Sequence, residues 1–260
     1  MITILMIKNN NYAMICEYEG TKYNGFQSQS TNNTIQDKIE HSICKITNSS
    51  INIDYAGRTD SGVHAKHQVI SVNLKWNHEP IKLQNAINNY LPNDIRVKNI
   101  KIAPKHFHPR KSAISRSYEY SILTSNNSDV FTRNTVLQFS DELNLYYINK
   151  CLNILKGKHN FRNFCKKESI PENPIRILYE TSMKQDKNIL KLKFKGSSFL
   201  RHQVRFMVGI ILKIGMKKIP FETLKMMLES KKSSNFFIKY NVPPRGLCLT
   251  LVEYDGFSLN

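Results

Sequence analysis

Residues 55–65, with the sequence YAGRTDSGVHA, place one carboxylate, one guanidinium group and two glycines in a short segment. The carboxylate of Asp60 could serve there as a nucleophile or a general base toward a substrate. The plainer interpretation is an Asx-turn, in which the Asp60 side chain only hydrogen-bonds nearby backbone. These few letters alone favour the plainer interpretation, so the rest of the chain must decide between the two.

A tight loop between two extended segments would position Asp60. Ile51 and Ile53 alternate with polar residues before the loop, and the run QVISVNL alternates after it. This pattern predicts extended chain on both sides. Gly57 and Gly62 would allow the loop backbone angles that a side chain forbids.

A second informative segment is LRHQVRFMVGIILKI, residues 200–214, which reads as a helix that is apolar on most sides and carries Arg205 in its middle. Burying an unpaired charge is costly, because the charge loses its hydration. The guanidinium of Arg205 should therefore either pair with a carboxylate or extend to solvent, and both outcomes are open.

Aromatic residues form two further groups of interest. Tyr118 and Tyr120 would lie on one face of a strand predicted over residues 118–123, where they either pack together or stack on a partner. Tyr23 and Phe26 stand in the polar loop GTKYNGFQSQSTNN. Stacking on nucleobases and simple anchoring of the loop are equally open for this second pair.

The spacing of apolar residues predicts the elements that position these side chains. Thr34 offers an N-cap to the first helix, and Pro92 stops the second. The predicted helices cover residues 35–46, 83–91, 145–155, 200–214 and 221–228, and the predicted strands cover 13–18, 118–123, 189–195 and 247–251. Helices and strands mixed in this way predict an α+β fold. We expect two domains, residues 1–106 with the Asp60 loop and residues 107–260, linked near Pro109.

The charge balance points to a polyanionic partner. The chain has 38 Lys and Arg against 20 Asp and Glu, and a net charge of +18. Such an excess favours nucleic acid first, while a composition biased toward Lys and Asn is the alternative explanation. Lys191, Lys193 and Lys195 alternate with apolar residues, which predicts either a basic stripe or a solvated lysine face.

Cysteine and histidine spacing argues against a metal site. The five cysteines include no CxxC pair, which predicts a reducing compartment and no structural zinc. The pairs His64 with His67 and His106 with His108 lack further ligands at metal spacing, so we expect surface or RNA-facing histidines. The apolar start MITILM is shorter than a signal-peptide core, and no apolar run approaches a membrane span. We therefore expect a cytoplasmic protein.

Seven blocks cover nearly the whole chain in order: EYEGTKYNGFQSQS with TIQDKIEHSI, GRTDSGVHA, AINNYLPNDI, FHPRKSAISRSYEY, GKHNFRNF, FLRHQVRFMVG and PPRGLCLTLVEY. In order and spacing they resemble the TruA family of tRNA pseudouridine synthases, which modify uridines in the anticodon stem and loop. GRTDSG alone could occur by chance, but seven ordered blocks are highly specific. Three residues depart from the family pattern: Phe26 stands where Trp is frequent, Ser61 where Ala is usual, and Asn160 where Asp commonly follows the His.

The resemblance implies a pseudouridine synthase fold, in which two related α+β domains have antiparallel sheets that meet across a basic central cleft and helices on the outer face. It also implies a homodimer that binds tRNA, and no metal or cofactor. By position, Asp60 resembles the essential catalytic aspartate and Arg205 its basic partner. Arg58 resembles the arginine that helps displace the target base, Tyr118 the tyrosine beside the uracil, and Leu247 an apolar wall near the base.

The sequence also permits three rival functions. A catalytically silent RNA-binding protein could use the same basic cleft, but Asp60 would then face phosphates, which disfavours binding. A glycoside hydrolase would need a second acid, and the sequence offers no convincing one. A structural ribosome-associated protein is permitted by the charge alone.

Overall fold

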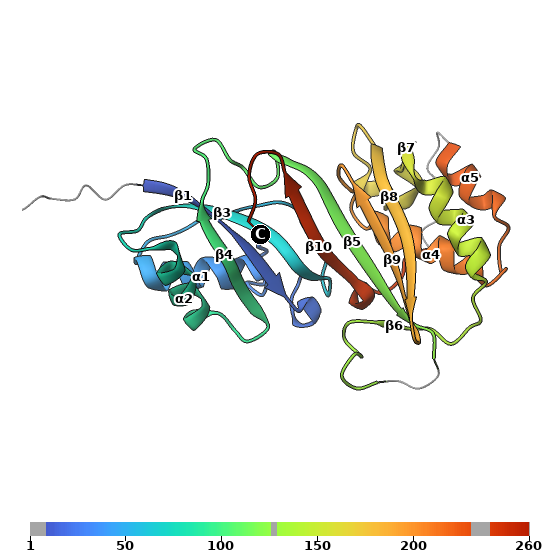
Figure 1. The fold of residues 1–260 in the computed structure, drawn as a ribbon, viewed down its shortest axis with the longest axis horizontal. Helices are drawn as coiled ribbons and strands as arrows, with labels where there is room; N and C mark the ends of the chain where they lie inside the picture. The colour runs from blue at the N-terminus through green and yellow to red at the C-terminus, as the bar shows by residue number, and fades with distance from the viewer. Residues whose placement is uncertain (1–8, 126–128, 230–239, 260) are drawn as a thin grey trace, which may run out of the picture. The chain divides into compact units, whose positions relative to one another are not determined.

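The computed structural model describes residues 9–125, 129–229 and 240–259 (Figure 1). The chain forms two compact units, of which unit 1 comprises Met1–Ile114 and Leu249–Asn260 and unit 2 comprises Ser115–Cys248. Two strands, β5 (Ala113–Leu123) and β10 (Leu247–Tyr254), carry the chain from one unit into the other. This division differs from the expected one, in which the boundary followed residue 106 and the C-terminal strand stayed in the second domain.

Aromatic packing explains why the segment around Pro109 belongs to unit 1. The Phe107 ring centroid lies 4.9 Å from that of Tyr254 and 4.8 Å from that of Phe257. The Tyr254 hydroxyl donates a hydrogen bond to the Pro109 carbonyl at 3.0 Å. Because these partners come from the far end of the chain, the local sequence around Pro109 gives no sign of them.

Unit 1 is built on a sheet with strand order β4-β1-β3-β10, with the short β2 beside β3. The pairs β1 with β3, β1 with β4 and β2 with β3 are antiparallel. The bounds are β1 (Asn9–Tyr18), β2 (Asp54–Tyr55), β3 (His64–Lys75) and β4 (Ile95–Ile102). The middle of β1 is buried on both faces, which makes it a core strand of the unit.

Two helices, α1 (Ile35–Thr47) and α2 (Pro80–Tyr90), cover this sheet (Figure 1). Thr34 caps α1 as predicted: its hydroxyl accepts from the Asp37 N–H, and the Asp37 carboxylate accepts from the Thr34 N–H. Ile35, Ile39 and Ile43 are fully buried along one face of α1. Each such side chain contributes about 1.5–3 kcal/mol by leaving water, so this apolar face holds α1 on the unit.

Unit 2 has the strand order β5-β9-β8-β7, and β6 runs parallel to β5. The pairs β5 with β9, β8 with β9 and β7 with β8 are antiparallel. The remaining bounds are β6 (Leu137–Gln138), β7 (Gly157–Asn160), β8 (Ile175–Asp186), β9 (Ile189–Gly196), α3 (Leu145–Leu155), α4 (Gln203–Gly215) and α5 (Glu222–Glu229). Both units are therefore α+β with mostly antiparallel strands, which confirms the predicted fold class.

The helix α4 is the most deeply buried helix of unit 2, because nearly all of its residues after Arg205 are inaccessible to solvent. Gly209 allows a close approach at its centre: a Cβ there would lie 1.5 Å from the Tyr240 carbonyl oxygen. Among the described residues, no helix combines the length and the apolar character needed to cross a membrane.

Candidate active site

The Asp60 loop connects β2 to β3, whose antiparallel pairing brings the two ends of the loop together. Its last part is a turn, in which the Val63 N–H donates to the Asp60 carbonyl at 3.1 Å and Gly62 takes a φ of +77°. Asp60 is partly exposed, and Arg58 is exposed. The turn thus presents a carboxylate and a guanidinium from one short loop, as the sequence predicted.

Buried groups fix the backbone on the N-terminal side of Asp60. Thr59 is buried, and its Oγ1 lies 2.8 Å from the hydroxyl of Tyr18, which is also buried. The Phe26 N–H donates to the Thr59 carbonyl at 3.1 Å. Earlier in the loop, the Gln68 side chain donates to the Gly57 carbonyl at 2.7 Å. Because these partners belong to strands and a packed loop, the carboxylate stands on a rigid base.

Tyr23 and Phe26 are buried and anchor the loop, which leaves neither ring free to stack on a nucleobase, so the stacking hypothesis is wrong for both. Phe26 is fully buried, and its ring centroid lies 4.7 Å from that of Tyr55 and 6.0 Å from that of Tyr18. Tyr23 is 6% exposed, and its hydroxyl donates to the Asp94 carboxylate at 2.5 Å. The sequence could not separate these roles because both interpretations use the same aromatic residues in a polar loop.

The glycine roles are also partly different from those expected. Gly62 has a positive φ, whereas Gly57 does not, and a Cβ on Gly57 would meet no atom within 4 Å. Gly25, in the neighbouring loop, has a φ of +88°, and a Cβ there would lie 2.8 Å from the Thr59 carbonyl oxygen. The close approach to the Thr59 carbonyl therefore requires a glycine that lies outside the Asp60 loop.

Unit 2 carries the other three candidates, Tyr118, Arg205 and Leu247. Tyr118 lies on β5, where its ring makes an edge contact with Phe199 at 5.0 Å between centroids. Leu247 begins β10 and is 5% exposed. Tyr120, two residues beyond Tyr118 on β5, is fully buried. Of the two roles left open for this pair, the full burial of Tyr120 favours packing for Tyr120.

Arg205 lies in the first turn of α4 and not in the middle of a helix, because α4 begins at Gln203. His202, which immediately precedes α4, takes a φ of +64°. This left-handed conformation interrupts a right-handed helix, so the helix does not extend back to Leu200 as predicted. The Arg205 Nε donates to the Val242 carbonyl at 2.8 Å. Arg205 is partly exposed at the helix start, so its charge keeps access to solvent, which is one of the two outcomes that the sequence left open.

The segment of residues 240–246 connects these unit 2 residues. Its Val242 carbonyl holds Arg205, and its Pro243 carbonyl accepts from the Tyr120 hydroxyl at 2.7 Å. Burial raises the pKa of Tyr120, and the positive charges of Arg205 and Arg245 oppose that rise. Gly246 then packs against the Tyr120 ring. One segment therefore gathers Arg205, strand β5 and the start of β10.

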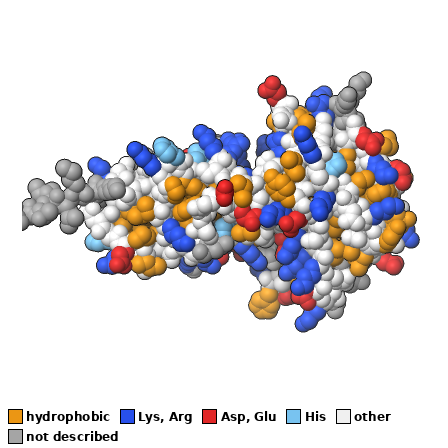
Figure 2. Space-filling model, turned by 45° about the horizontal axis from the view of Figure 1, so that its top comes forward, with side chains coloured by type: hydrophobic (Ala, Val, Ile, Leu, Met, Phe, Trp, Pro, Cys, Tyr) orange, Lys and Arg blue, Asp and Glu red, His pale blue; other side chains and the backbone are white. Residues whose placement is uncertain are grey.

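The predicted basic stripe on β9 is only partly a cationic surface. Glu119, opposite on β5, places its carboxylate 3.7 Å from the Lys191 Nζ and 3.5 Å from the Lys193 Nζ. Elsewhere, Lys and Arg side chains are scattered over both units on the face seen in Figure 2. On that face the positive charge is therefore spread over both units, and Glu119 neutralises part of the charge on β9.

The histidines have structural roles where their contacts are described. The Nδ1 of His64 accepts from the Gly20 N–H at 3.1 Å, and His64 is buried. The Nδ1 of His67 accepts from the Val252 N–H at 3.3 Å. The expectation of a surface or RNA-facing role is therefore wrong for His64. Within the described ranges, no group of three or more His, Cys, Asp or Glu could hold a metal ion.

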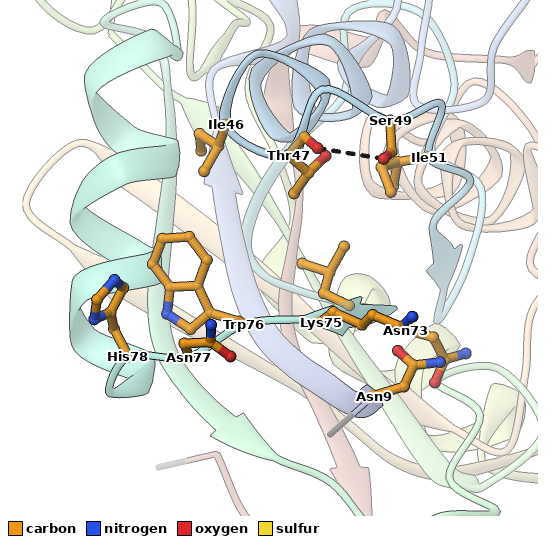
Figure 3. Close-up of a pocket in the computed structure, with 11 residues that line it drawn as sticks. Asn9, Ile46, Thr47, Ser49, Ile51, Asn73, Lys75, Trp76, Asn77 and His78 are labelled. Carbon is orange, nitrogen blue, oxygen red and sulfur yellow. Dashed lines mark hydrogen bonds between the residues drawn. The ribbon is translucent and has the colours of Figure 1, made fainter. Parts of the chain in front are cut away.

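A surface hollow of about 530 Å³ lies at the C-terminal end of β3, the end opposite the Asp60 loop (Figure 3). The rings of Trp76 and His78 are in contact beside the hollow. The Ser49 hydroxyl donates a hydrogen bond to the Thr47 carbonyl at its rim. Its lining includes none of the candidate residues. The hollow therefore does not belong to the candidate site.

Comparison with known proteins agrees with the resemblance in the sequence blocks. A family model described as tRNA pseudouridine synthase matches residues 14–110 and 152–255. The chain is 34% identical over 244 residues to tRNA pseudouridine synthase A of Pseudothermotoga lettingae, covering 94% of this chain and 99% of that protein. It is 35% identical over 241 residues to the Bacillus subtilis protein of that name, covering 92% and 97%, and 38% identical over 224 residues to the Thermotoga maritima one, covering 85% and 91%. The chain therefore belongs to the tRNA pseudouridine synthase family.

Proposed function

We propose that this protein is an isomerase that converts uridine to pseudouridine in the anticodon stem and loop of tRNA, with Asp60 as the catalytic carboxylate. The observation that carries the proposal is the Asp60 turn, in which buried bonds to Thr59 fix the backbone and leave the carboxylate partly exposed. A carboxylate held in this way suits chemistry at a defined atom better than a turn-forming role. The net charge of +18 suits a polyanionic substrate.

The reaction breaks the N1–C1′ glycosidic bond, turns the uracil and forms a C5–C1′ bond. C5 loses its hydrogen, N1 gains one, and the overall composition is unchanged. A single carboxylate is sufficient because no water has to be activated, unlike in a glycoside hydrolase. Asp60 would either attack C1′ or remove the C2′ proton, and both routes use the same group. Exclusion of water would keep the detached base from being lost to hydrolysis.

The remaining candidates have roles that follow from moving a base out of its stack. A flipped nucleotide loses a few kcal/mol of stacking, so a side chain that occupies the vacated space assists the process. Arg58, exposed beside Asp60, is our candidate for that role. Tyr118 and Leu247 are our candidates for the surfaces that receive the uracil.

Arg205 is our candidate for the cationic partner of Asp60. A positive charge in the first turn of a helix is disfavoured by the helix dipole, and a nearby anion offsets that cost. The bond from its Nε to the Val242 carbonyl fixes the plane of the guanidinium. Paired with Asp60, it would stabilise the ionised carboxylate.

We also propose that the protein works as a cytoplasmic homodimer without a metal or cofactor. Light scattering on the purified protein would measure the dimer. A mass of about 30 kDa, that of one chain, would contradict this part of the proposal and leave the catalytic part intact.

The decisive experiment incubates the purified protein with a tRNA anticodon-arm transcript that carries tritium at uridine C5. Pseudouridine formation releases the tritium, because C5 loses its hydrogen. We expect release by the native protein and none by Asp60→Asn, with binding of the transcript nearly unchanged and steeply weaker in high salt. Binding without release by the native protein would support the silent RNA-binding alternative. Normal release by Asp60→Asn would refute the role of Asp60.

A further inference from the structure

The side chain of Asp94, 34 positions after Asp60, connects to the Asp60 loop through partly buried contacts. Asp94, just before β4, accepts a hydrogen bond of 2.5 Å from the Tyr23 hydroxyl, and its carbonyl accepts from the Glu19 N–H at 3.0 Å. The Lys22 Nζ lies 3.9 Å from the same carboxylate. Burial raises the pKa of the Tyr23 hydroxyl, and the Asp94 carboxylate adds to that rise.

The loop that Asp94 holds is the one that touches the Asp60 turn. The Ser61 hydroxyl donates to the Tyr23 carbonyl at 3.1 Å. The Phe26 N–H donates to the Thr59 carbonyl, and Gly25 lies against the same carbonyl. The residues on both sides of Asp60 are therefore bonded to residues 23–26, whose position depends on the buried Tyr23 ring and its hydroxyl.

We propose that Tyr23 and Asp94 are positioning residues for Asp60, acting through the bond from the Ser61 hydroxyl to the Tyr23 carbonyl. The inference rests on the proposed function, because it needs Asp60 to be the catalytic group. Tyr23 is 6% exposed, which keeps it from contacting RNA. Loosening this pair therefore moves the carboxylate and leaves the RNA-binding surface as it was.

Ser61 is the residue that makes this connection particular to the present chain. It stands where the family pattern usually has Ala, which has no hydroxyl to donate. The bond from Ser61 to the Tyr23 carbonyl is thus an addition that ties the residue after Asp60 directly to the anchored loop.

The test measures kcat and KM by tritium release for Tyr23→Phe, which removes only the hydroxyl. We expect kcat to fall about tenfold, with KM for the transcript within twofold of native, because a displaced carboxylate affects the chemical step. Tyr12→Phe is the matched control, since Tyr12 is a buried tyrosine of β1 in the same unit. Among the described residues, its hydroxyl accepts one long hydrogen bond, of 3.4 Å, from the Asn10 side chain. Tyr12→Phe should leave kcat unchanged.

Two further variants separate positioning from a general loss of stability. Asp94→Asn keeps an acceptor for the Tyr23 hydroxyl and should retain most of kcat, whereas Asp94→Ala should lose about as much as Tyr23→Phe. Ser61→Ala should lower kcat, and adding Tyr23→Phe to it should cost less than tenfold if the two act along one path.

The outcomes are distinct. Native kcat in folded Tyr23→Phe, a change confined to KM, or fully additive effects with Ser61→Ala would each overturn the inference. If Tyr23→Phe does not fold, Ser61→Ala and Asp94→Asn decide, because Ser61 is exposed and Asn retains the acceptor. An active Asp60→Asn would instead refute the proposed function, so the two failures are distinguishable.

Discussion

Gly25→Ala tests directly whether the neighbouring loop controls the Asp60 turn. The native φ of +88° costs a residue with a side chain about 1–2 kcal/mol. The new methyl group would lie 2.8 Å from the Thr59 carbonyl oxygen and 3.2 Å from the Asp60 carbonyl carbon. Overpacking of this kind typically costs about 1–3 kcal/mol, so we expect a loss of about 2–5 kcal/mol in the free energy of unfolding. The methyl also pushes the Asp60 backbone away, so kcat should fall roughly 10- to 100-fold.

Thermal unfolding and single-turnover tritium release, measured at a temperature where the variant is folded, separate the two effects of Gly25→Ala. Gly256→Ala is the control for backbone strain, because Gly256 has a φ of +67° but a Cβ there meets no atom within 4 Å. It should lose stability and keep kcat. Gly57→Ala should change neither, since its φ is not positive and the space is open. Native kcat in folded Gly25→Ala would refute the claim that this contact holds the catalytic loop.

Three other changes have expected outcomes. Gly209→Ala should prevent unit 2 from folding, because the methyl would lie 1.5 Å from the Tyr240 carbonyl oxygen, and circular dichroism with limited proteolysis would reveal it. Phe26→Ala should lower the free energy of unfolding by about 3–5 kcal/mol in a urea titration, since the ring is fully buried. Iodoacetamide at pH 8 should alkylate Cys44, which is partly exposed, well before Cys165, because burial raises the pKa of the Cys165 thiol to about 11 and mass spectrometry can locate the adducts.

The sequence predicted the elements whose apolar residues face a core. The helix α1 is an example, because Thr34 and the isoleucine spacing define both its start and its buried face. Strand β8 was not predicted, because few of its apolar residues face a core. Only Leu178 of its residues is buried, and Ile175 and Ile177 are exposed. Pairing with β7 and β9 stabilises β8, and such pairing leaves little trace in local periodicity.

The candidate site likewise combines features that the local sequence determines with features that depend on contacts between distant segments. The Asp60 turn was predictable because Asp, Ser and Gly are turn residues wherever they occur together. The contribution of Gly25 was not, because it depends on the Thr59 carbonyl of another loop. The start of α4 was also hidden, since nothing in the letters shows that His202 takes a left-handed conformation.

The three departures from the family pattern show how distant contacts decide the meaning of a substitution. Phe26 lies wholly inside unit 1, so a Trp there would differ in the volume it fills and in an indole N–H that needs an acceptor. The Asn160 side-chain carbonyl accepts from the Arg162 N–H at 3.1 Å, a bond that an Asp carboxylate would also accept, so the loop keeps its anchor. Ser61 differs from both, because its hydroxyl gains a partner that Ala could not have. Of the three, Ser61 is the one whose reversal should alter the rate of the reaction, since its side-chain bond ties the residue after Asp60 to the Tyr23 carbonyl.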